Sequence, residues 1–140
     1  MANQVAVGVA VMILTAYIHT WALGVALTSF DSLKAWARRD ASAFRLSTVM
    51  AATMIWVMSA HLLEVGVWAL VFIFLGIFDN FSVAVYFALV AYTTLGFGDI
   101  ILPEDWRILS GMAAANGFLV FGWSTAFQVE ILNDLRRADG

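Results

Sequence analysis

Long uncharged stretches of apolar residues constrain this chain more than any other feature of its sequence. Residues 5–30 and 108–129 carry no Asp, Glu, Lys or Arg, and a further apolar run at 46–78 is interrupted by His61 and Glu64. About 20 apolar residues in a helix are enough to cross the hydrocarbon core of a bilayer. The sequence therefore predicts an integral membrane protein with three spanning helices.

The overall composition agrees with lipid as the solvent of this chain. Hydrophobic residues make up 63% and charged residues 12% of the 140 residues, and the mean hydropathy is +0.90. The net charge of -3 comes without a basic stripe, so nucleic acid is not an expected partner. Cysteine is absent, which excludes disulfides and thiolate metal sites. Nothing in the sequence pairs a nucleophile with a base, so neither an enzyme nor a cofactor is expected.

The apolar segment at 81–94 is too short to cross the membrane. A helix of about 14 residues reaches roughly 20 Å, whereas the hydrocarbon core measures about 30 Å. Six of the seven Lys and Arg residues lie in the polar break at 31–45 or in the C-terminal tail, and such residues favour the cytoplasmic side. Both basic regions lie on the same side of the membrane if residues 81–94 enter and leave the membrane from one side instead of crossing it. We therefore predict a multi-pass cell-membrane protein with its N-terminus outside and its basic loop and C-terminus in the cytoplasm.

A glycine-containing string follows this short segment. Residues 93–99 read Thr-Thr-Leu-Gly-Phe-Gly-Asp. Non-helical backbone at membrane depth is tolerated where it is buried or lines an aqueous path. Alternate glycines can adopt positive φ, which lets successive carbonyls point to one side, and four such segments around an axis would replace the hydration shell of a monovalent cation. The alternative is a simple turn at the membrane surface.

Residues 92–99 resemble the signature sequence of the potassium channel superfamily. The resemblance covers residues 46–135, which are similar to a two-helix pore module, and the stretches 106–107, 116–117 and 121–125 also resemble small bacterial ion-channel proteins. It implies an all-α homotetramer in membrane lipid that passes K⁺ passively. The expected parts are an N-terminal transmembrane helix (1–30), a cytoplasmic basic loop (31–45), a pore domain (46–135) with pore helix 81–92, filter 93–99 and inner helix 108–132, and a cytoplasmic tail (136–140).

The resemblance also implies a role for individual residues. The residues expected to coordinate K⁺ are Thr94, Leu95, Gly96 and Phe97. The residues expected to support the filter are Thr93, Gly98, Asp99, Tyr86 and Phe87. Asp99 would brace the filter from behind, while Tyr86 and Phe87, which stand where many relatives carry two tryptophans, would form an aromatic cuff.

Two departures from the family pattern bear on selectivity. Phe97 replaces a commoner tyrosine and so lacks a hydroxyl able to bond to the pore helix. Val90 occupies a position that is acidic in some relatives. A weakly selective channel for Na⁺ and K⁺ is therefore one alternative, and a non-conducting regulatory subunit with the same fold is another.

Other polar or small residues in the apolar runs have two readings each. Gly117 either allows close helix packing or permits a gating bend. His61 and Glu64 share a helix face with Val57 and Trp68, and an ionisable side chain at this depth costs roughly 3 kcal/mol, so both should meet protein partners. The pair is either a structural link to the pore or inner helix or a proton sensor. The inner-helix residues that either line a cavity or join helices are Asn116, Ser124, Thr125 and Gln128.

Overall fold

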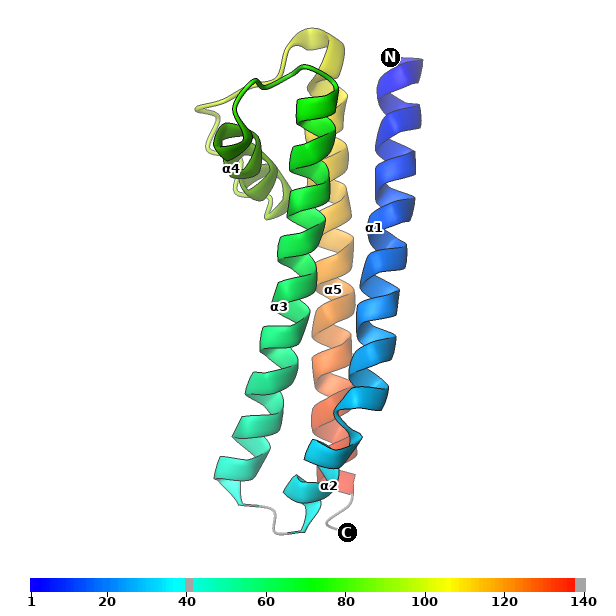
Figure 1. The fold of residues 1–140 in the computed structure, drawn as a ribbon, viewed down its shortest axis with the longest axis vertical. Coiled ribbons are helices and arrows are strands. Elements are labelled where there is room, and N and C mark those ends of the chain that lie inside the picture. Colours follow the sequence, from blue (N-terminus) through cyan, green and yellow to red (C-terminus); the bar gives the residue numbers. More distant parts are fainter. Residues whose placement is uncertain (40–41, 138–140) are drawn as a thin grey trace.

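Three long helices run side by side in the computed structural model of this chain (Figure 1). They are α1 (Ala2–Ser29), α3 (Ala43–Phe74) and α5 (Arg107–Arg137). The shorter elements are α2 (Asp31–Arg38), α4 (Phe81–Tyr92) and the 3-10 turn Glu104–Trp106. The structure describes residues 1–39 and 42–137, and these contain no strand. The predicted all-α class is confirmed, whereas the end of the predicted tail, 138–140, lies outside the described residues.

Two of the helices, α1 and α3, are long and apolar enough to cross a membrane. The helix α4 is apolar but has only 12 residues. The helix α5 has 31 residues and is long enough to span a membrane. Its amide and hydroxyl side chains lower its mean hydropathy, so it is not among the helices that are apolar enough to be candidate spans. Length and composition thus support two of the three predicted spans, and the third stays a prediction.

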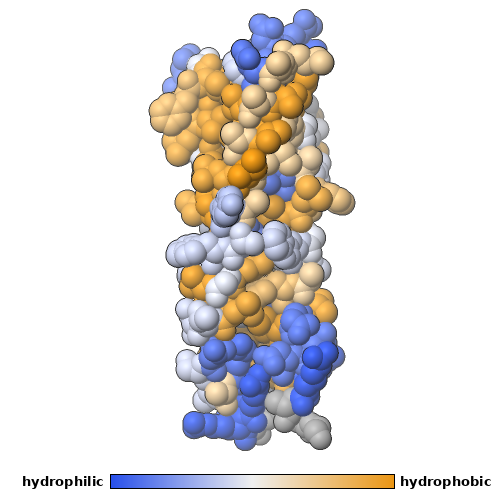
Figure 2. Space-filling view, turned by 90° about the vertical axis from the view of Figure 1, so that its right-hand side faces the viewer, coloured by the Kyte–Doolittle hydropathy of each residue, from blue (hydrophilic) through white to orange (hydrophobic). Residues whose placement is uncertain are grey.

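The helix α4 doubles back beside α3 and α5 instead of running the length of the bundle (Figure 1). It lies near the end of the bundle that holds the N-terminus, and α2 lies at the opposite end with the last described turn of α5. Figure 2 shows hydrophilic residues at both ends of one face and most of the hydrophobic surface between them. This distribution suits a bundle whose middle lies in hydrocarbon.

Capping residues set where the helices begin after the loops. The Asn80 side chain accepts a hydrogen bond from the Ser82 amide at 2.8 Å and so starts α4. Ser42 caps α3 through the Arg45 amide in the same way. Beyond α3, Gly76 has a φ of +67°, a conformation that turns the chain toward α4. The predicted basic loop is itself partly helical, since α2 lies inside it.

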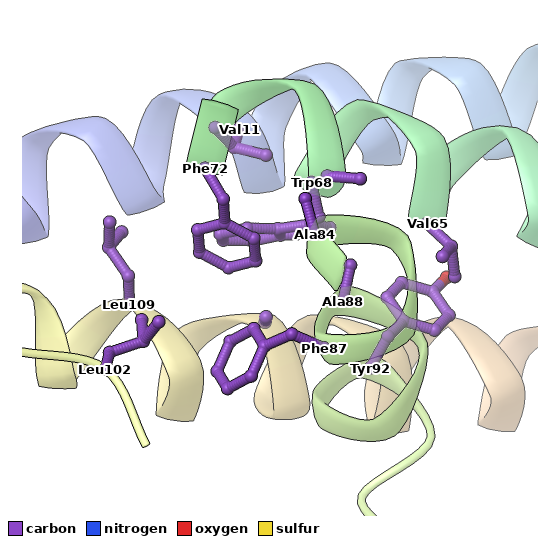
Figure 3. Close-up of a cluster of buried hydrophobic side chains, with 12 residues drawn as sticks. Val11, Val65, Trp68, Phe72, Ala84, Phe87, Ala88, Tyr92, Leu102 and Leu109 are labelled. Carbon is purple, nitrogen blue, oxygen red and sulfur yellow. The ribbon is translucent and has the colours of Figure 1, made fainter. Parts of the chain in front are cut away.

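A hydrophobic core holds α4 against the long helices (Figure 3). Phe72 of α3 and Phe87 of α4 meet edge to face with ring centroids 5.3 Å apart. Ala84 and Ala88 are fully buried, and their small size lets α4 approach closely. The core therefore fixes α4 by apolar packing.

The opposite end of the bundle is joined by charge as well as by packing. Arg38 of α2 forms an ion pair with Asp134 of α5 at 2.7 Å, and Lys34 lies 3.9 Å from the same carboxylate. Beneath them Ala37, Ile131 and Leu135 are buried together. The basic segment is thus attached to the end of α5.

Candidate functional site

The backbone of residues 93–99 leaves the helical conformation directly after α4. Thr94, Gly96 and Gly98 have φ values of +60°, +54° and +77°, and the residues between them do not share this sign. The amides of Leu95 and Gly96 both donate to the Val90 carbonyl, at 3.1 Å and 3.3 Å. A β-branched residue at positive φ is a strained outlier, and such strain gathers at functional sites. The positive φ expected at both glycines is therefore observed and extends to Thr94.

The helix α4 braces this segment through one tyrosine. The Tyr86 hydroxyl donates to Asp99 Oδ2 at 2.6 Å. Phe87, by contrast, is buried in the core shown in Figure 3. The two aromatic residues predicted as a cuff thus differ in role, because Tyr86 holds Asp99 and Phe87 anchors α4. Thr93 closes the inner end, with its hydroxyl donating to the Leu89 carbonyl at 2.7 Å.

The segment itself is exposed on the single chain. Residues 94–99 are all exposed, and the side chains of Leu95 and Phe97 are 58% and 65% accessible. A shallow groove behind the segment separates it from α5. Its floor includes Gly111 and Ala114, which leave room beside Gly96 and Gly98. A single chain therefore leaves one side of this backbone unpacked.

At Gly117 the helix α5 packs directly against the end of α4. A Cβ at this position would overlap the carbonyl oxygen of Tyr92 and lie 2.8 Å from its carbonyl carbon. The helix α5 runs through Gly117 as one continuous helix. Close packing against the last residue of α4 therefore accounts for this glycine without a bend.

His61 and Glu64 meet partners on both the pore helix and the inner helix, as their depth requires. His61 Nδ1 lies 3.1 Å from the Tyr92 hydroxyl, and its Nε2 lies 2.8 Å from Ser124 Oγ. The Tyr92 hydroxyl also donates to the Glu64 carboxylate. All four side chains are buried. Tyr92 immediately precedes residues 93–99, so this network reaches the start of that segment.

His19 of α1, which no sequence motif marked, completes the network. Its Nδ1 lies 3.0 Å from Glu64 Oε1 and its Nε2 3.1 Å from Ser124 Oγ. One turn earlier, Thr15 bonds to Asn116 at 2.8 Å. The helical spacing of Val11, Thr15 and His19 on one buried face was the available signal.

The remaining inner-helix polar residues mostly join helices within the chain. Trp68 Nε1 donates to Asn116 Oδ1 at 2.8 Å, and Thr53 donates to Gln128 at 3.0 Å. Both amide side chains are buried. Thr125 differs, because it is exposed and bonds to its own helix.

Comparison with known proteins places the chain in a family. A family model described as ion channel matches residues 60–134, more than half of the chain. No curated protein and no solved structure was found to match. The matched range runs from the middle of α3 through α4 and the filter segment to the end of α5, and it omits α1. The chain therefore belongs to the ion channel family, as a pore-domain protein of the membrane.

Proposed function

We propose that the protein is a K⁺-selective channel in which four identical chains surround one filter made by residues 93–99. The observation that carries the proposal is the alternation of positive φ at Thr94, Gly96 and Gly98 directly after a half-length helix. Alternate left-handed residues allow the carbonyls of a short strand to face one axis and to coordinate a dehydrated cation. The Thr94 hydroxyl and the carbonyls of 94–97 are the proposed ligands.

A tetramer follows from the geometry of such a filter. One chain supplies one side of a coordination cage, and closed rotational symmetry supplies the others. The exposed side chains of Leu95 and Phe97 give each copy an apolar surface to bury against its neighbours. In this assembly α1, α3 and α5 span the membrane, with the N-terminus outside and α2 in the cytoplasm.

The degree of selectivity depends on how firmly the filter is held. The bond from Tyr86 to Asp99 supplies a brace that Phe97 and Val90 cannot make. We infer from it that K⁺ is preferred over Na⁺. A weakly selective channel would instead give a reversal potential near zero in opposed K⁺ and Na⁺ gradients, and a regulatory subunit would give no flux.

Flux measurements on reconstituted protein test the proposal with a matched pair of variants. Gly96 and Gly66 both have open space where a Cβ would lie, but only Gly96 has positive φ. Gly96→Ala should abolish K⁺ flux into liposomes, because a Cβ disfavours that φ and moves the carbonyl. Gly66→Ala should conduct as the wild type does. Equal flux in both variants would exclude residues 93–99 as the filter.

A further inference from the structure

A buried cluster of metal-ligating side chains lies where α1, α3, α4 and α5 meet. His19, His61 and Glu64 each place a ligand atom within 4.8 Å of the others. His19 and Glu64 are fully buried, and His61 is 5% exposed. Phe121 stacks on the His61 ring at 4.3 Å between centroids and shields it. The described residues thus hold two imidazoles and one carboxylate in an apolar surrounding.

Ser124 contacts the Nε2 atom of both histidines. Its hydroxyl has a single hydrogen, which it donates to the Val120 carbonyl at 3.0 Å. The Ser124 oxygen can then accept from the Nε2–H groups of both histidines, at 2.8 Å and 3.1 Å. In that arrangement the Nδ1 atom of each ring faces away from Ser124 and toward Glu64.

The two Nδ1 atoms lie close to the same carboxylate. His19 Nδ1 lies 3.0 Å from Glu64 Oε1, and His61 Nδ1 lies 3.5 Å from Oε2. A metal ion placed among these atoms would take the position of the protons that otherwise join the histidines to Glu64. The cluster therefore offers its ligand atoms to one common position.

We propose that this cluster binds one divalent transition-metal ion, of which Zn²⁺ is the best match, through Nδ1 of His19, Nδ1 of His61 and the carboxylate of Glu64. Two histidines and a glutamate are an established zinc donor set. With bonds of about 2.1 Å, the ligand atoms of a tetrahedral site lie about 3.4 Å apart. The separations of 3.0 Å and 3.5 Å are close to that value.

Tyr92 is the fourth ligand in this site. Its hydroxyl oxygen is 3.1 Å from His61 Nδ1 and is bonded to Glu64. On binding, the phenol proton leaves to solvent, and the phenolate with Glu64 neutralises the two charges of the metal. Ser124 then serves as the outer partner of both histidines, the role that second hydrogen-bond partners play around metal sites.

A cavity between α3 and α5 gives access to the cluster. It is lined by Val57, Met58, His61, Phe121 and Ser124, among others, so it reaches one ligand and the outer partner. Because Tyr92 is the last residue of α4, an ion bound here would tie α1 and α3 to the start of the filter. That consequence for conduction rests on the proposed channel function, whereas metal binding itself does not.

Metal binding is tested on the full-length, tag-free protein in detergent after removal of metals by a chelator. Titration with Co²⁺ should produce the absorption bands of a tetrahedral site, and elemental analysis after Zn²⁺ loading should give one ion per chain. His19→Gln should weaken Co²⁺ binding at least tenfold. Thr15→Val is the matched control, since it removes a buried cross-helix bond one turn away on α1 and leaves every ligand in place.

The readout needs no ion flux, so its failure is distinct from failure of the channel proposal. Gel filtration first establishes that each variant is folded, and His61→Gln replaces His19→Gln if the latter is not. Wild-type protein without Co²⁺ bands or bound zinc would overturn the proposal and leave a proton as the shared cation. A folded His19→Gln protein that binds Co²⁺ as tightly as Thr15→Val would overturn it as well.

Discussion

Gly117→Ala should destabilise the fold and impair conduction together. The added Cβ overlaps the Tyr92 carbonyl oxygen and lies 2.8 Å from the carbonyl carbon. These are backbone atoms at the junction of α4 and the filter, so they cannot rotate away as a side chain could. Overpacking of this kind costs about 1–3 kcal/mol and occasionally more, and we expect the upper end of that range. Relief of the overlap would move α4 and with it the start of the filter.

Gly122→Ala on the same helix is the control that separates the cost of overpacking from the change in helix propensity. A Cβ at Gly122 meets nothing within 4 Å. Both substitutions gain about 1 kcal/mol of helix propensity, so this gain cancels in the comparison. Unfolding in mixed micelles at increasing SDS gives the stability difference, and liposome flux gives the functional one. If Gly117→Ala is as stable as Gly122→Ala but alters conduction, Gly117 acts as a hinge and the packing assignment is wrong.

Three further predictions concern the polar contacts. Glu64→Ala should lower the free energy of unfolding by about 1–3 kcal/mol, the usual effect of leaving a buried polar group without its hydrogen-bond partner, whereas Ser59→Ala on an exposed turn of α3 should change it little. Tyr86→Phe should lower K⁺ selectivity in bi-ionic reversal potentials, because it removes the brace on Asp99, and Tyr17→Phe on the exposed face of α1 should not. Phe97→Tyr should retain K⁺ flux, and loss of flux would argue that the open space around residue 97 is needed.

The helices could be predicted from the sequence because lipid imposes a simple rule. Apolar runs of spanning length identified α1 and α3, and the short run before Thr93 identified α4 as a half-helix. The uncharged run at 108–129 likewise predicted the helix α5, but Asn116 and Gln128 lower its hydropathy, so composition alone does not support it as a span. Both amides are buried by partners on other helices, and hydropathy does not register such partners.

The site could be predicted only as far as local sequence determines it. Positive φ at Gly96 and Gly98 follows from the residue type, and the structure has it. The brace from Tyr86 to Asp99 depends on how α4 packs, because the two residues come together only once α4 is fixed by its core. The helical spacing of apolar residues predicted that Glu64 lies on a buried face of its helix, but it does not determine which other helix supplies the partners of Glu64.

The role of α1 follows from those partners. This helix lies outside residues 60–134, the range matched by the ion channel family, so the family match assigns no role to it. Thr15 and His19 nevertheless supply bonds to Asn116 and to Glu64, which belong to the pore domain. The Glu64 carboxylate is fully buried, so water cannot replace a hydrogen-bond partner that it loses. Removal of α1 would therefore leave Glu64 without its bond to His19 inside the membrane. The pore domain of this chain therefore depends on α1 for the integrity of the network that ends at Tyr92, and a chain truncated before α3 should be less stable than the full one.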